Sequence, residues 1–477
     1  MLDDKFLFPF EHVAHNSQIL IYGAGELGQA YAKQIMITGY CNLLGIIDRN
    51  CKSYVDTVIP VYPPYSIHTL SFDRIVVALK NPGGLPEIRR VLANEGVPDE
   101  KIVFIGKRDK IAWNLFLDGS VNSSVGEKLA WNCGTVSIAL FLLTAMGGMF
   151  FIKRFIQEIV RLLPDCKIDI YITQLGNPIR CFYSDIPNIN TFVQNLGSRY
   201  IQNRDQYDLA MQVNSGGFLT VDVFKPDRIP SQYVDFKNKI QYLQKRIKND
   251  EYTDSMPRIV LFQNRRFHGQ NAYTAFNYGV FDIQDKKVSI PLNVEAWKRF
   301  NSMRLERYIT LNYGNGSCKD GSKIAKMWPL ERFNSLIQLF KKQYPAISVV
   351  QLGTADAERI DGADRYIFGE SFELVIHILK NSILHIDIEG GLVHLATQLG
   401  TKCAVLFGPT PEFYYGYEEN INIKVGNCHD CCGVYMDSNR CARGMEKPEC
   451  MYSITPEIVM ERVKEHLKFN DTFSLRW

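Results

Sequence analysis

A lysine, a pair of glycines and a histidine in the last third of the chain have the types and spacing of residues that bind a diphosphate. Lys326 precedes an expected helix at 329–343, and Gly390–Gly391 opens a second expected helix that carries His394. The start of a helix presents unpaired backbone N–H groups and the positive end of the helix dipole to an anion. A lysine beside it adds a point charge. The pattern therefore predicts a site for the phosphates of a nucleotide.

Two further loops carry groups suited to the rest of a nucleotide. Asp356 and Glu358 follow an expected strand, and their carboxylates could accept hydrogen bonds from ribose hydroxyls. Thr410 lies in a Gly-Pro-Thr loop after the expected strand at 402–407. Open α/β sheets bind ligands at the carboxyl ends of their strands, where both loops are expected.

Alternating strands and helices must position these loops. The last third has expected strands at 308–312, 348–352, 384–388 and 402–407, and expected helices at 329–343, 372–381 and 392–400. The middle third has expected strands at 136–143 and 168–172, and expected helices at 151–163 and 231–254. This alternation predicts parallel sheets covered by helices.

Another glycine motif lies near the start of the chain. Gly23, Gly25 and Gly28 follow a short apolar strand and begin a helix. In a Rossmann-like unit such glycines allow a tight turn, a close approach by phosphate and close packing of helix on strand. Asp48 ends the next expected strand, where an acid can bind a ribose. The motif predicts a Rossmann-like module, with three uses left open: binding a nucleotide, binding a nicotinamide for redox chemistry, or an accessory role.

Composition and charge narrow the class of protein. The 477 residues carry a net charge of +3 and no long basic run, so a nucleic-acid partner is not expected. The N-terminus lacks the layout of a signal peptide. The apolar stretch at 136–152 is broken by Ser137, Thr144 and a glycine pair, so a transmembrane segment is not expected either. We expect a cytoplasmic protein whose twelve cysteines are mostly thiols or metal ligands.

A cysteine-rich segment near the C-terminus is a candidate metal site. Cys428 and Cys431 have the spacing of a metal-binding knuckle, and Cys441 and Cys450 could complete four thiolate ligands. His429 is an alternative ligand. Ligand type favours zinc over iron. Free thiols and a disulfide remain alternatives to a structural metal.

Together these motifs resemble the family 9 glycosyltransferases, the ADP-heptose heptosyltransferases. The resemblance covers about 130–470 and is closest over 306–465, where Lys326 falls in a Lys-x-Trp-Pro element. In the family an acid, a small residue and a glycine precede two residues and a histidine; the acid here is Glu389, where the family more often has Asp.

The resemblance implies an α/β protein of GT-B fold, in which two Rossmann-like lobes follow the smaller Rossmann-like module. The expected divisions are the module at 1–110, a linker at 111–130, an acceptor lobe at 131–300 and a donor lobe at 301–477. The expected donor-binding residues are Asn315, Lys326, Trp328, Asp356, Glu389, Gly390, Gly391, Leu392, His394 and Thr410.

The resemblance also implies an activity: inverting transfer of a sugar, heptose above all, from a nucleoside-diphosphate sugar to a glycan or protein acceptor. Transfer needs no cofactor, and such proteins act in bacterial surface-polysaccharide or protein glycosylation, in some cases as homo-oligomers. Some relatives that glycosylate secreted adhesins bind iron at the cysteine-rich loop. Trp328 could stack on the donor base, although a tryptophan of this kind is more often a core residue.

One departure from the family concerns the catalytic base. The family places an Asp just after a glycine in the first loop of the acceptor lobe, but the matching loop here, Thr144–Lys153, contains no acid. An inverting transferase needs a base for the acceptor hydroxyl. Asp185, Asp208 and Asp222 are available in the same lobe, so the base comes from elsewhere or the chain is a non-catalytic nucleotide-sugar-binding or assembly subunit.

Overall fold

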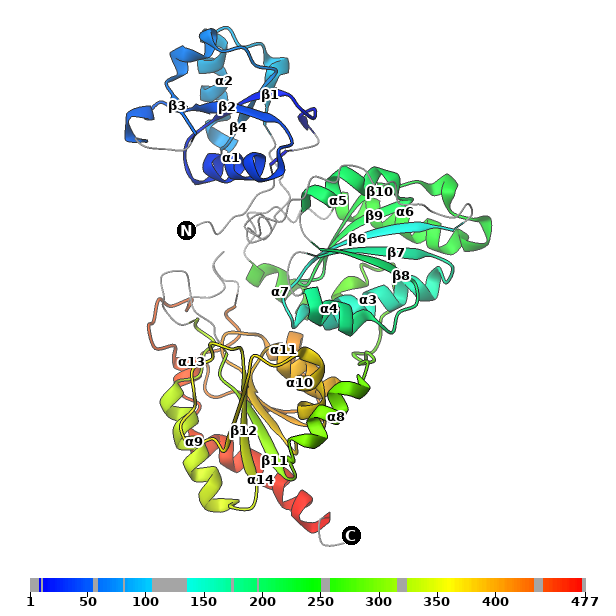
Figure 1. Cartoon of the computed structure of the whole chain (residues 1–477), viewed down its shortest axis with the longest axis vertical. Coiled ribbons are helices and arrows are strands. Elements are labelled where there is room, and N and C mark those ends of the chain that lie inside the picture. The colour runs from blue at the N-terminus through cyan, green and yellow to red at the C-terminus, as the bar shows by residue number, and fades with distance from the viewer. Residues whose placement is uncertain are drawn as a thin grey trace.

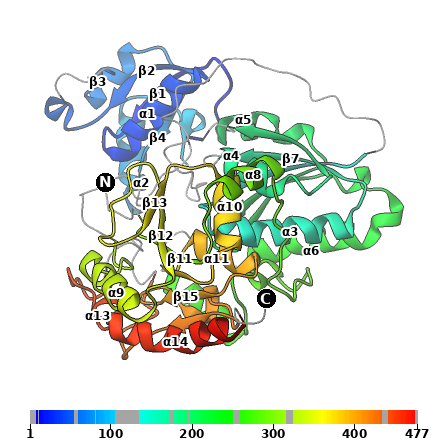
Figure 2. The same ribbon diagram turned by 60° about the horizontal axis from the view of Figure 1, so that its bottom comes forward.

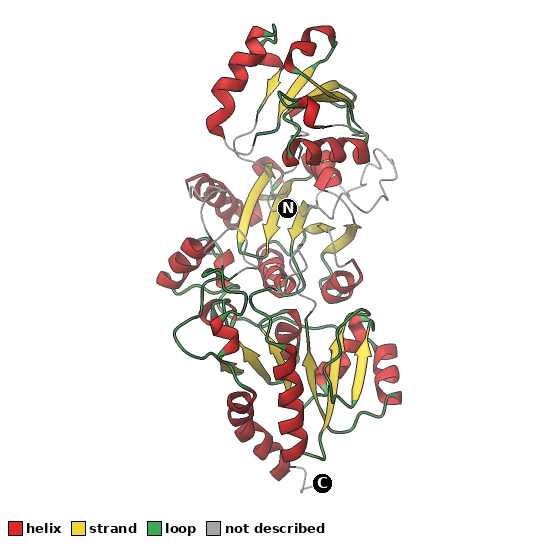
Figure 3. Cartoon of the chain, turned by 90° about the vertical axis from the view of Figure 1, so that its left-hand side faces the viewer, coloured by secondary structure: helices red, strands yellow, loops and turns green. Residues whose placement is uncertain are grey.

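The computed structural model shows three α/β units that follow one another along the chain (Figure 1). The residues it describes are 8–9, 12–54, 59–79, 82–104, 135–172, 176–194, 197–249, 258–314, 324–432 and 441–473. The predicted linker at 111–130 lies outside them. Each unit is built on its own sheet, and each sheet has helices along its faces (Figure 3).

The first unit is a small parallel sheet with the strand order β3-β2-β1-β4-β5. Its strands are β1 (Gln18–Tyr22), β2 (Asn42–Ile47), β3 (Val61–Tyr62), β4 (Arg74–Val77) and β5 (Ile102–Val103), and its helices are α1 (Glu26–Thr38) and α2 (Leu85–Asn94). The order reverses between β1 and β4, as in Rossmann-like sheets. The glycine motif lies directly after β1, at this reversal.

The second unit has the strand order β10-β9-β6-β7-β8, in which only the edge strand β10 is antiparallel to its neighbour. Its strands are β6 (Ser137–Leu143), β7 (Lys167–Ile172), β8 (Ile189–Gln194), β9 (Leu209–Asn214) and β10 (Phe218–Phe224). Its helices are α3 (Gly148–Leu162), α4 (Gly176–Tyr183), α5 (Gly197–Asn203), α6 (Val234–Asn249) and α7 (Arg258–Phe267).

The third unit is a parallel sheet with the strand order β13-β12-β11-β14-β15-β16. Its strands are β11 (Tyr308–Asn312), β12 (Ser348–Gly353), β13 (Arg365–Phe368), β14 (His385–Ile388), β15 (Cys403–Leu406) and β16 (Ile421–Ile423). Its helices are α8 (Val294–Ser302), α9 (Leu330–Gln343), α10 (Phe372–Lys380), α11 (Gly391–Gln398), α12 (Glu412–Tyr415), α13 (Glu449–Tyr452) and α14 (Pro456–Phe473). Helices α9 and α14 lie side by side (Figure 2). These sheets confirm the predicted fold class.

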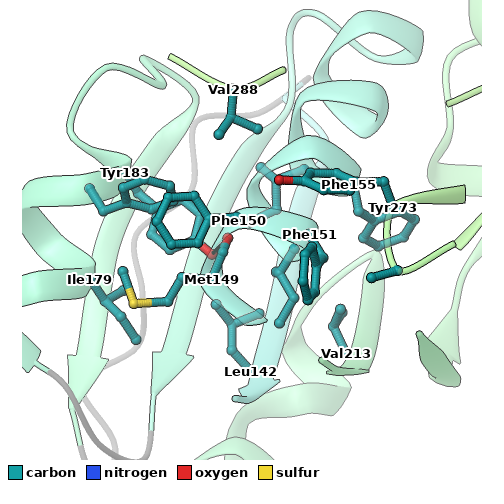
Figure 4. Packing of buried hydrophobic residues seen from close by; sticks show 14 of the residues in the cluster. Leu142, Met149, Phe150, Phe151, Phe155, Ile179, Tyr183, Val213, Tyr273 and Val288 are labelled. Atoms are coloured by element: carbon teal, nitrogen blue, oxygen red, sulfur yellow. Dashed lines mark hydrogen bonds between the residues drawn. The ribbon is translucent and has the colours of Figure 1, made fainter. Parts of the chain in front are cut away.

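The second and third units, called here the N-lobe and the C-lobe, share one hydrophobic core. A single cluster of buried side chains runs from strands and helices of the N-lobe to Val393, Tyr414 and other residues of the C-lobe. Helix α3 is central to it: Met149, Phe150 and Phe155 are fully buried, and they point toward neighbouring elements on several sides (Figure 4). Lys153 and Glu158 of α3 are buried as well, so the helix is covered on several sides and fixes the N-lobe against its surroundings.

The apolar stretch at 136–152 forms strand β6 and the start of α3, as expected. Among the described residues, none of the helices combines the length and the hydrophobicity needed to cross a membrane.

Candidate functional site

The candidate site lies where the strand order of the C-lobe sheet reverses, between β11 and β14. Ligands of open α/β sheets bind at such a reversal, beyond the carboxyl ends of the strands. Asn312 ends β11, and its side-chain amide donates to Asp387 in β14 at 3.0 Å. Glu389 follows β14 and leads into the Gly390–Gly391 turn. Parallel pairing thus brings two segments more than 70 residues apart in the sequence to one edge.

Glu389 is held from two sides. Lys326 Nζ donates to the backbone oxygen of Glu389 at 3.0 Å and lies 3.4 Å from its Oε2, while His394 Nε2 lies 3.3 Å from its Oε1. Burial raises the pKa of the Glu389 carboxyl, but the charge of Lys326 and the hydrogen bond and charge of His394 outweigh it, so the pKa falls to about 2. Glu389 is therefore an ionised anchor at neutral pH.

The Gly390–Gly391 turn begins helix α11 beside this anchor. The turn and Leu392 are partly exposed, and the Lys326 side chain is 32% exposed. The first backbone N–H groups of a helix have no partner inside it. The turn therefore presents hydrogen-bond donors and the positive end of the helix dipole, and Lys326, which is paired with Glu389, adds a partly exposed N–H donor beside it. This arrangement suits the phosphates of a ligand.

His394 does not share that exposure. It is 1% exposed, its Nδ1 lies 2.9 Å from the hydroxyl of Tyr417, and the rings of Phe150 and Phe151 lie against it. His394 is thus buried behind Glu389 in this structure, and its expected part in donor binding stays a prediction. The side chain positions Glu389. The sequence did not indicate Tyr417 as a residue of the site, because no local sequence pattern links it to His394.

Trp328 requires a correction. Its side chain is fully buried, and its indole N–H donates to the backbone oxygen of Ile454 at 2.9 Å. A ring in this place cannot stack on a nucleotide base, so the core alternative is the correct one. Trp328 fixes the segment that carries Lys326 against the start of α14.

The remaining donor candidates that the structure describes lie on loops that follow strands of the same sheet. Asp356 and Glu358 are exposed after β12, and Asp356 accepts a hydrogen bond from Thr354 at 2.7 Å. Thr410 is 6% exposed, and its hydroxyl has no hydrogen-bond partner among the described residues. Asn315 lies outside the described residues. Roles for these side chains in donor binding stay predictions.

A loop of the N-lobe rests directly on the Gly390–Gly391 turn. A Cβ atom added to Gly391 would lie 2.8 Å from Cγ of Met146, and one added to Gly147 would lie 3.1 Å from Cδ2 of His394. Both distances are shorter than ordinary contacts, so each glycine makes room for a side chain of the other lobe. The loop expected to carry a catalytic base therefore contacts the candidate donor site.

The residue just after Gly147 has no room for a side chain. A Cβ atom at Gly148 would lie 2.1 Å from Cβ of Ser215 and 2.3 Å from Oγ1 of Thr144. An acid at this position would require its neighbours to move. The packing around Gly148 thus disfavours an acid at this one position of the loop.

The three acids considered as substitutes hold the N-lobe together. Asp185 pairs with Lys153 at 2.7 Å. Asp208 accepts from the backbone and hydroxyl of Ser137, both at 2.9 Å. Asp222 accepts from Tyr200 at 2.6 Å and from Gln212 at 3.0 Å. Each carboxylate has a structural role that accounts for its position.

Polar contacts tie the two lobes together behind this loop. Arg265 is 5% exposed and donates to the backbone oxygens of Gly216 and Gly217 in the N-lobe and to the hydroxyl of Tyr414 in the C-lobe. The hydroxyls of Tyr273 and Tyr417 lie 2.8 Å apart. The closed arrangement of the lobes is therefore held by hydrogen bonds as well as by the shared core.

In the N-terminal module the glycines form the expected turn. A Cβ atom added to Gly28 would lie 1.8 Å from the backbone oxygen of Gly23. Gly23 has a backbone φ of 105°, which favours glycine. The two carboxylate oxygens of Asp48 accept from the backbone N–H groups of Ala24 and Asn50 at 2.7 and 2.8 Å. Asp48 thus stabilises the turn, while nucleotide binding by the module, Gly25 included, stays a prediction.

The four candidate metal ligands line one cavity of about 340 Å³. Cys428, Cys431, Cys441 and Cys450 face it together with Ala325 and Pro409. Burial is the main cause that raises the pKa of the Cys450 thiol to about 12, and the neighbouring cysteines add to it. All cysteines in the described ranges are free thiols. Within those ranges, which omit 433–440, no three His, Cys, Asp or Glu side chains are arranged to hold a metal ion. Four cysteine thiolates are ligands that zinc and iron prefer.

Comparisons with known proteins give likenesses of structure only. No protein-family description matches the sequence, and no curated protein matches it. A family 9 glycosyltransferase from Veillonella parvula is 16% identical, with a TM-score of 0.44, over 71% of this chain and 99% of its own. ADP-heptose lipopolysaccharide heptosyltransferase II of E. coli is 14% identical, with a TM-score of 0.46, over 70% and 100%. The iron-containing dodecameric glycosyltransferase TibC of enterotoxigenic E. coli is 13% identical, with a TM-score of 0.46, over 70% and 76%.

Proposed function

We propose that the chain is a glycosyltransferase that moves a sugar from a nucleoside-diphosphate donor to a glycan or protein acceptor. The observation that carries this proposal is the anion site formed by Lys326 and the Gly390–Gly391 turn, anchored by Glu389 at the strand reversal of the C-lobe. Heptose is the proposed sugar, ADP-heptose the proposed donor, and inversion the proposed stereochemistry. The cytoplasm is the proposed compartment.

The chemistry of transfer explains why such a site is needed. Breaking the bond between the sugar and the diphosphate places negative charge on the leaving phosphate. Backbone N–H groups and a cation that are already in place stabilise this charge without reorganising. Glu389 keeps Lys326 beside the turn. The acceptor hydroxyl would approach from the N-lobe, whose loop at 144–148 faces the turn.

We expect Lys326→Met to weaken donor binding about 10- to 100-fold, because a hydrogen bond to a charged group is worth about 1.5–3 kcal/mol. The measurement is calorimetric titration with ADP and with ADP-heptose. Lys342→Met, an exposed lysine on α9 of the same lobe, is the matched control and should bind both ligands like the wild type. Equal affinities in the two variants would contradict the assignment of the anion site.

A second candidate function is a nucleotide-sugar-binding or assembly subunit that catalyses nothing. The observation that favours it is the loop at 144–153, which contains no acid and in which a side chain at Gly148 would require Ser215 and Thr144 to move. Purified protein incubated with ADP-, GDP- or UDP-sugars and a saccharide acceptor separates the two. Donor binding without hydrolysis or transfer would support the binding subunit, whereas transfer would support the enzyme.

For the cysteine-lined cavity we propose one structural metal ion per chain, zinc or iron, held by the four thiolates. We expect elemental analysis of protein purified without chelators to find about one ion per chain. The double variant Cys428→Ser and Cys431→Ser should lose it. Cys432→Ser is the control, since Cys432 does not line the cavity. Metal-free wild-type protein, or full retention by the double variant, would contradict the proposal.

The N-terminal module is proposed to bind a nucleotide at its glycine turn. Its use in redox chemistry is a weaker alternative, because the sequence has no set of residues that resembles a hydride-transfer site. Binding of an ADP-sugar without binding of NAD(H) would remove the redox alternative.

A further inference from the structure

A chain of hydrogen bonds runs behind the proposed donor site. It starts at Gln398, the last residue of α11, whose Nε2 lies 3.1 Å from the hydroxyl of Tyr273. The hydroxyls of Tyr273 and Tyr417 lie 2.8 Å apart, and the hydroxyl of Tyr417 lies 2.9 Å from Nδ1 of His394. Both tyrosines and the histidine are buried. Buried polar groups need hydrogen-bond partners, so the side chains of this chain depend on one another.

The amide of Gln398 gives the chain a direction. Its Oε1 accepts from the backbone N–H of Val288 at 2.9 Å, and its Nε2 donates to the backbone oxygen of Lys286 at 2.6 Å. A backbone N–H can only donate and a backbone oxygen can only accept, so these two contacts fix which end of the amide is the nitrogen. The nitrogen end faces Tyr273, and Gln398 therefore donates to the hydroxyl of Tyr273.

The two tyrosines pass this direction on to His394. Burial raises the pKa of both hydroxyls, so both keep their protons at neutral pH. Among the described residues, the Tyr273 hydroxyl contacts only Gln398, which donates to it, and Tyr417, which must accept its proton. The proton of Tyr417 then points to Nδ1 of His394. An imidazole that accepts at Nδ1 is neutral and has its proton on Nε2.

The opposite direction leaves a proton without an acceptor. If His394 donated from Nδ1, Tyr417 would accept from it and would donate to Tyr273. The hydroxyl of Tyr273 would then receive two hydrogen bonds, one of them from Gln398, and its own proton would have no acceptor among the described residues. Leaving a buried donor unpaired costs free energy, so the chain favours His394 with Nδ1 as an acceptor.

The Nε2–H group of His394 meets a difficulty of the proposed donor site. Glu389 is ionised beside the Gly390–Gly391 turn, and a carboxylate there repels a phosphate and attracts Lys326 away from it. Nε2 of His394 lies 3.3 Å from Oε1 of Glu389, and Lys326 lies 3.4 Å from Oε2. A hydrogen bond from a neutral imidazole offsets part of the charge of Glu389 without using Lys326 for that purpose.

We infer that Tyr417 and Tyr273 are positioning residues of the donor site, which hold His394 as an Nε2–H donor to Glu389. This role rests on the proposed function. Tyr273 precedes the C-lobe in the sequence, and its ring lies 4.9 Å from that of Phe151 in α3 (Figure 4). The chain therefore links the donor site of the C-lobe to a helix of the N-lobe.

Tyr417→Phe removes the hydroxyl that donates to His394 and keeps the ring. We expect ADP to bind about threefold to tenfold more weakly, the equivalent of one hydrogen bond, because Glu389 then has a less well held partner. Tyr273→Phe should weaken binding less, because Tyr417 keeps its proton. Tyr308→Phe is the matched control: Tyr308 is buried in the same lobe, and its hydroxyl donates to the backbone oxygen of Ile378 at 2.7 Å, outside the chain. It should bind ADP like the wild type.

The state of His394 is measured separately, by proton–nitrogen NMR of the full chain labelled with nitrogen-15 histidine. The variant His394→Gln assigns its signals, and melting curves confirm that the variants fold. In the wild type we expect a neutral ring with its proton on Nε2. In Tyr417→Phe the Nδ1 signal should move toward that of a nitrogen without a hydrogen bond, whereas Tyr308→Phe should leave it unchanged.

Two results would overturn the inference: a proton on Nδ1 of His394 in the wild type at neutral pH, or equal ADP affinities in Tyr417→Phe and Tyr308→Phe. Failure of the proposed function gives a different result, in which Lys326→Met binds ADP as well as the wild type does. The ring signals of His394 then still decide whether the tyrosines position it, because they are read without ADP.

Discussion

Replacing Lys153 by methionine should lower the free energy of unfolding by about 3 kcal/mol. The Lys153 side chain is fully buried in α3, and its ammonium donates to the backbone oxygens of Phe182 and Ser289 and to Asp185, each at 2.7 Å. Burial lowers the pKa of Lys153, and the hydrogen bond and charge of Asp185 oppose that effect. Methionine fills similar space but leaves the two carbonyls without this donor and Asp185 with the hydroxyl of Ser289 as a donor but no cation. Equilibrium unfolding in urea measures the loss.

Breaking a buried ion pair typically lowers the free energy of unfolding by about 3–5 kcal/mol. We expect the lower end of this range, because 27% of the Asp185 side chain is exposed to water. Lys298→Met is the control: Lys298 pairs with Glu295 at 2.7 Å but is 66% exposed, so its loss should cost at most about 1 kcal/mol. Adding Asp185→Asn to Lys153→Met should cost less than the sum of the single changes, since it removes the unpaired charge. Additive costs would mean that the pair is not coupled.

The sequence was most informative where local pattern and fold agree. The apolar run at 136–143 predicted β6, and the glycine pair before a helical pattern predicted the start of α11 at Gly391. These features depend on side-chain periodicity and backbone freedom within one short segment. The alternation of such segments was enough to predict the α/β class.

The roles of single side chains in the site were harder to predict, because they are set by residues far away in the sequence. The local motif of His394 says nothing about Tyr417 or about the α3 rings that cover it. The sequence around Trp328 does not show whether its ring stacks on a nucleotide base or donates to the backbone of Ile454. Burial comes from tertiary contacts, and a single sequence does not list those contacts.

The missing base is the point at which sequence and structure agree most closely. The sequence showed a loop without an acid, and the structure shows that Gly148 has no room for one. Asp185 and Asp208 are committed to Lys153 and Ser137. If none of these described acids serves as the base for the acceptor hydroxyl, transfer by the wild-type chain should be slow.

Met146→Asp should raise the rate of sugar transfer about 10²–10⁴-fold, the usual contribution of a general base. Met146 is the loop residue whose side chain lies against Gly391, and it is partly exposed. Aspartate is smaller than methionine, so it fits without displacing neighbours and places a carboxylate at the donor turn, where an acceptor hydroxyl must come within about 3 Å. Turnover is measured with saturating ADP-heptose and a saccharide acceptor.

Met146→Asn is the matched control, because it has the same shape and polarity as aspartate but cannot take up a proton at neutral pH. It should leave turnover near the wild-type level. The gain in Met146→Asp should also disappear as the pH falls below the pKa of the new carboxyl, near 4 when unperturbed, because only the ionised form accepts a proton. Donor affinity should change far less than turnover, since Lys326 and the turn remain in place. If Met146→Asp is no faster than Met146→Asn, while both bind the donor, the absent carboxylate is not what limits transfer, and the binding-subunit alternative gains support.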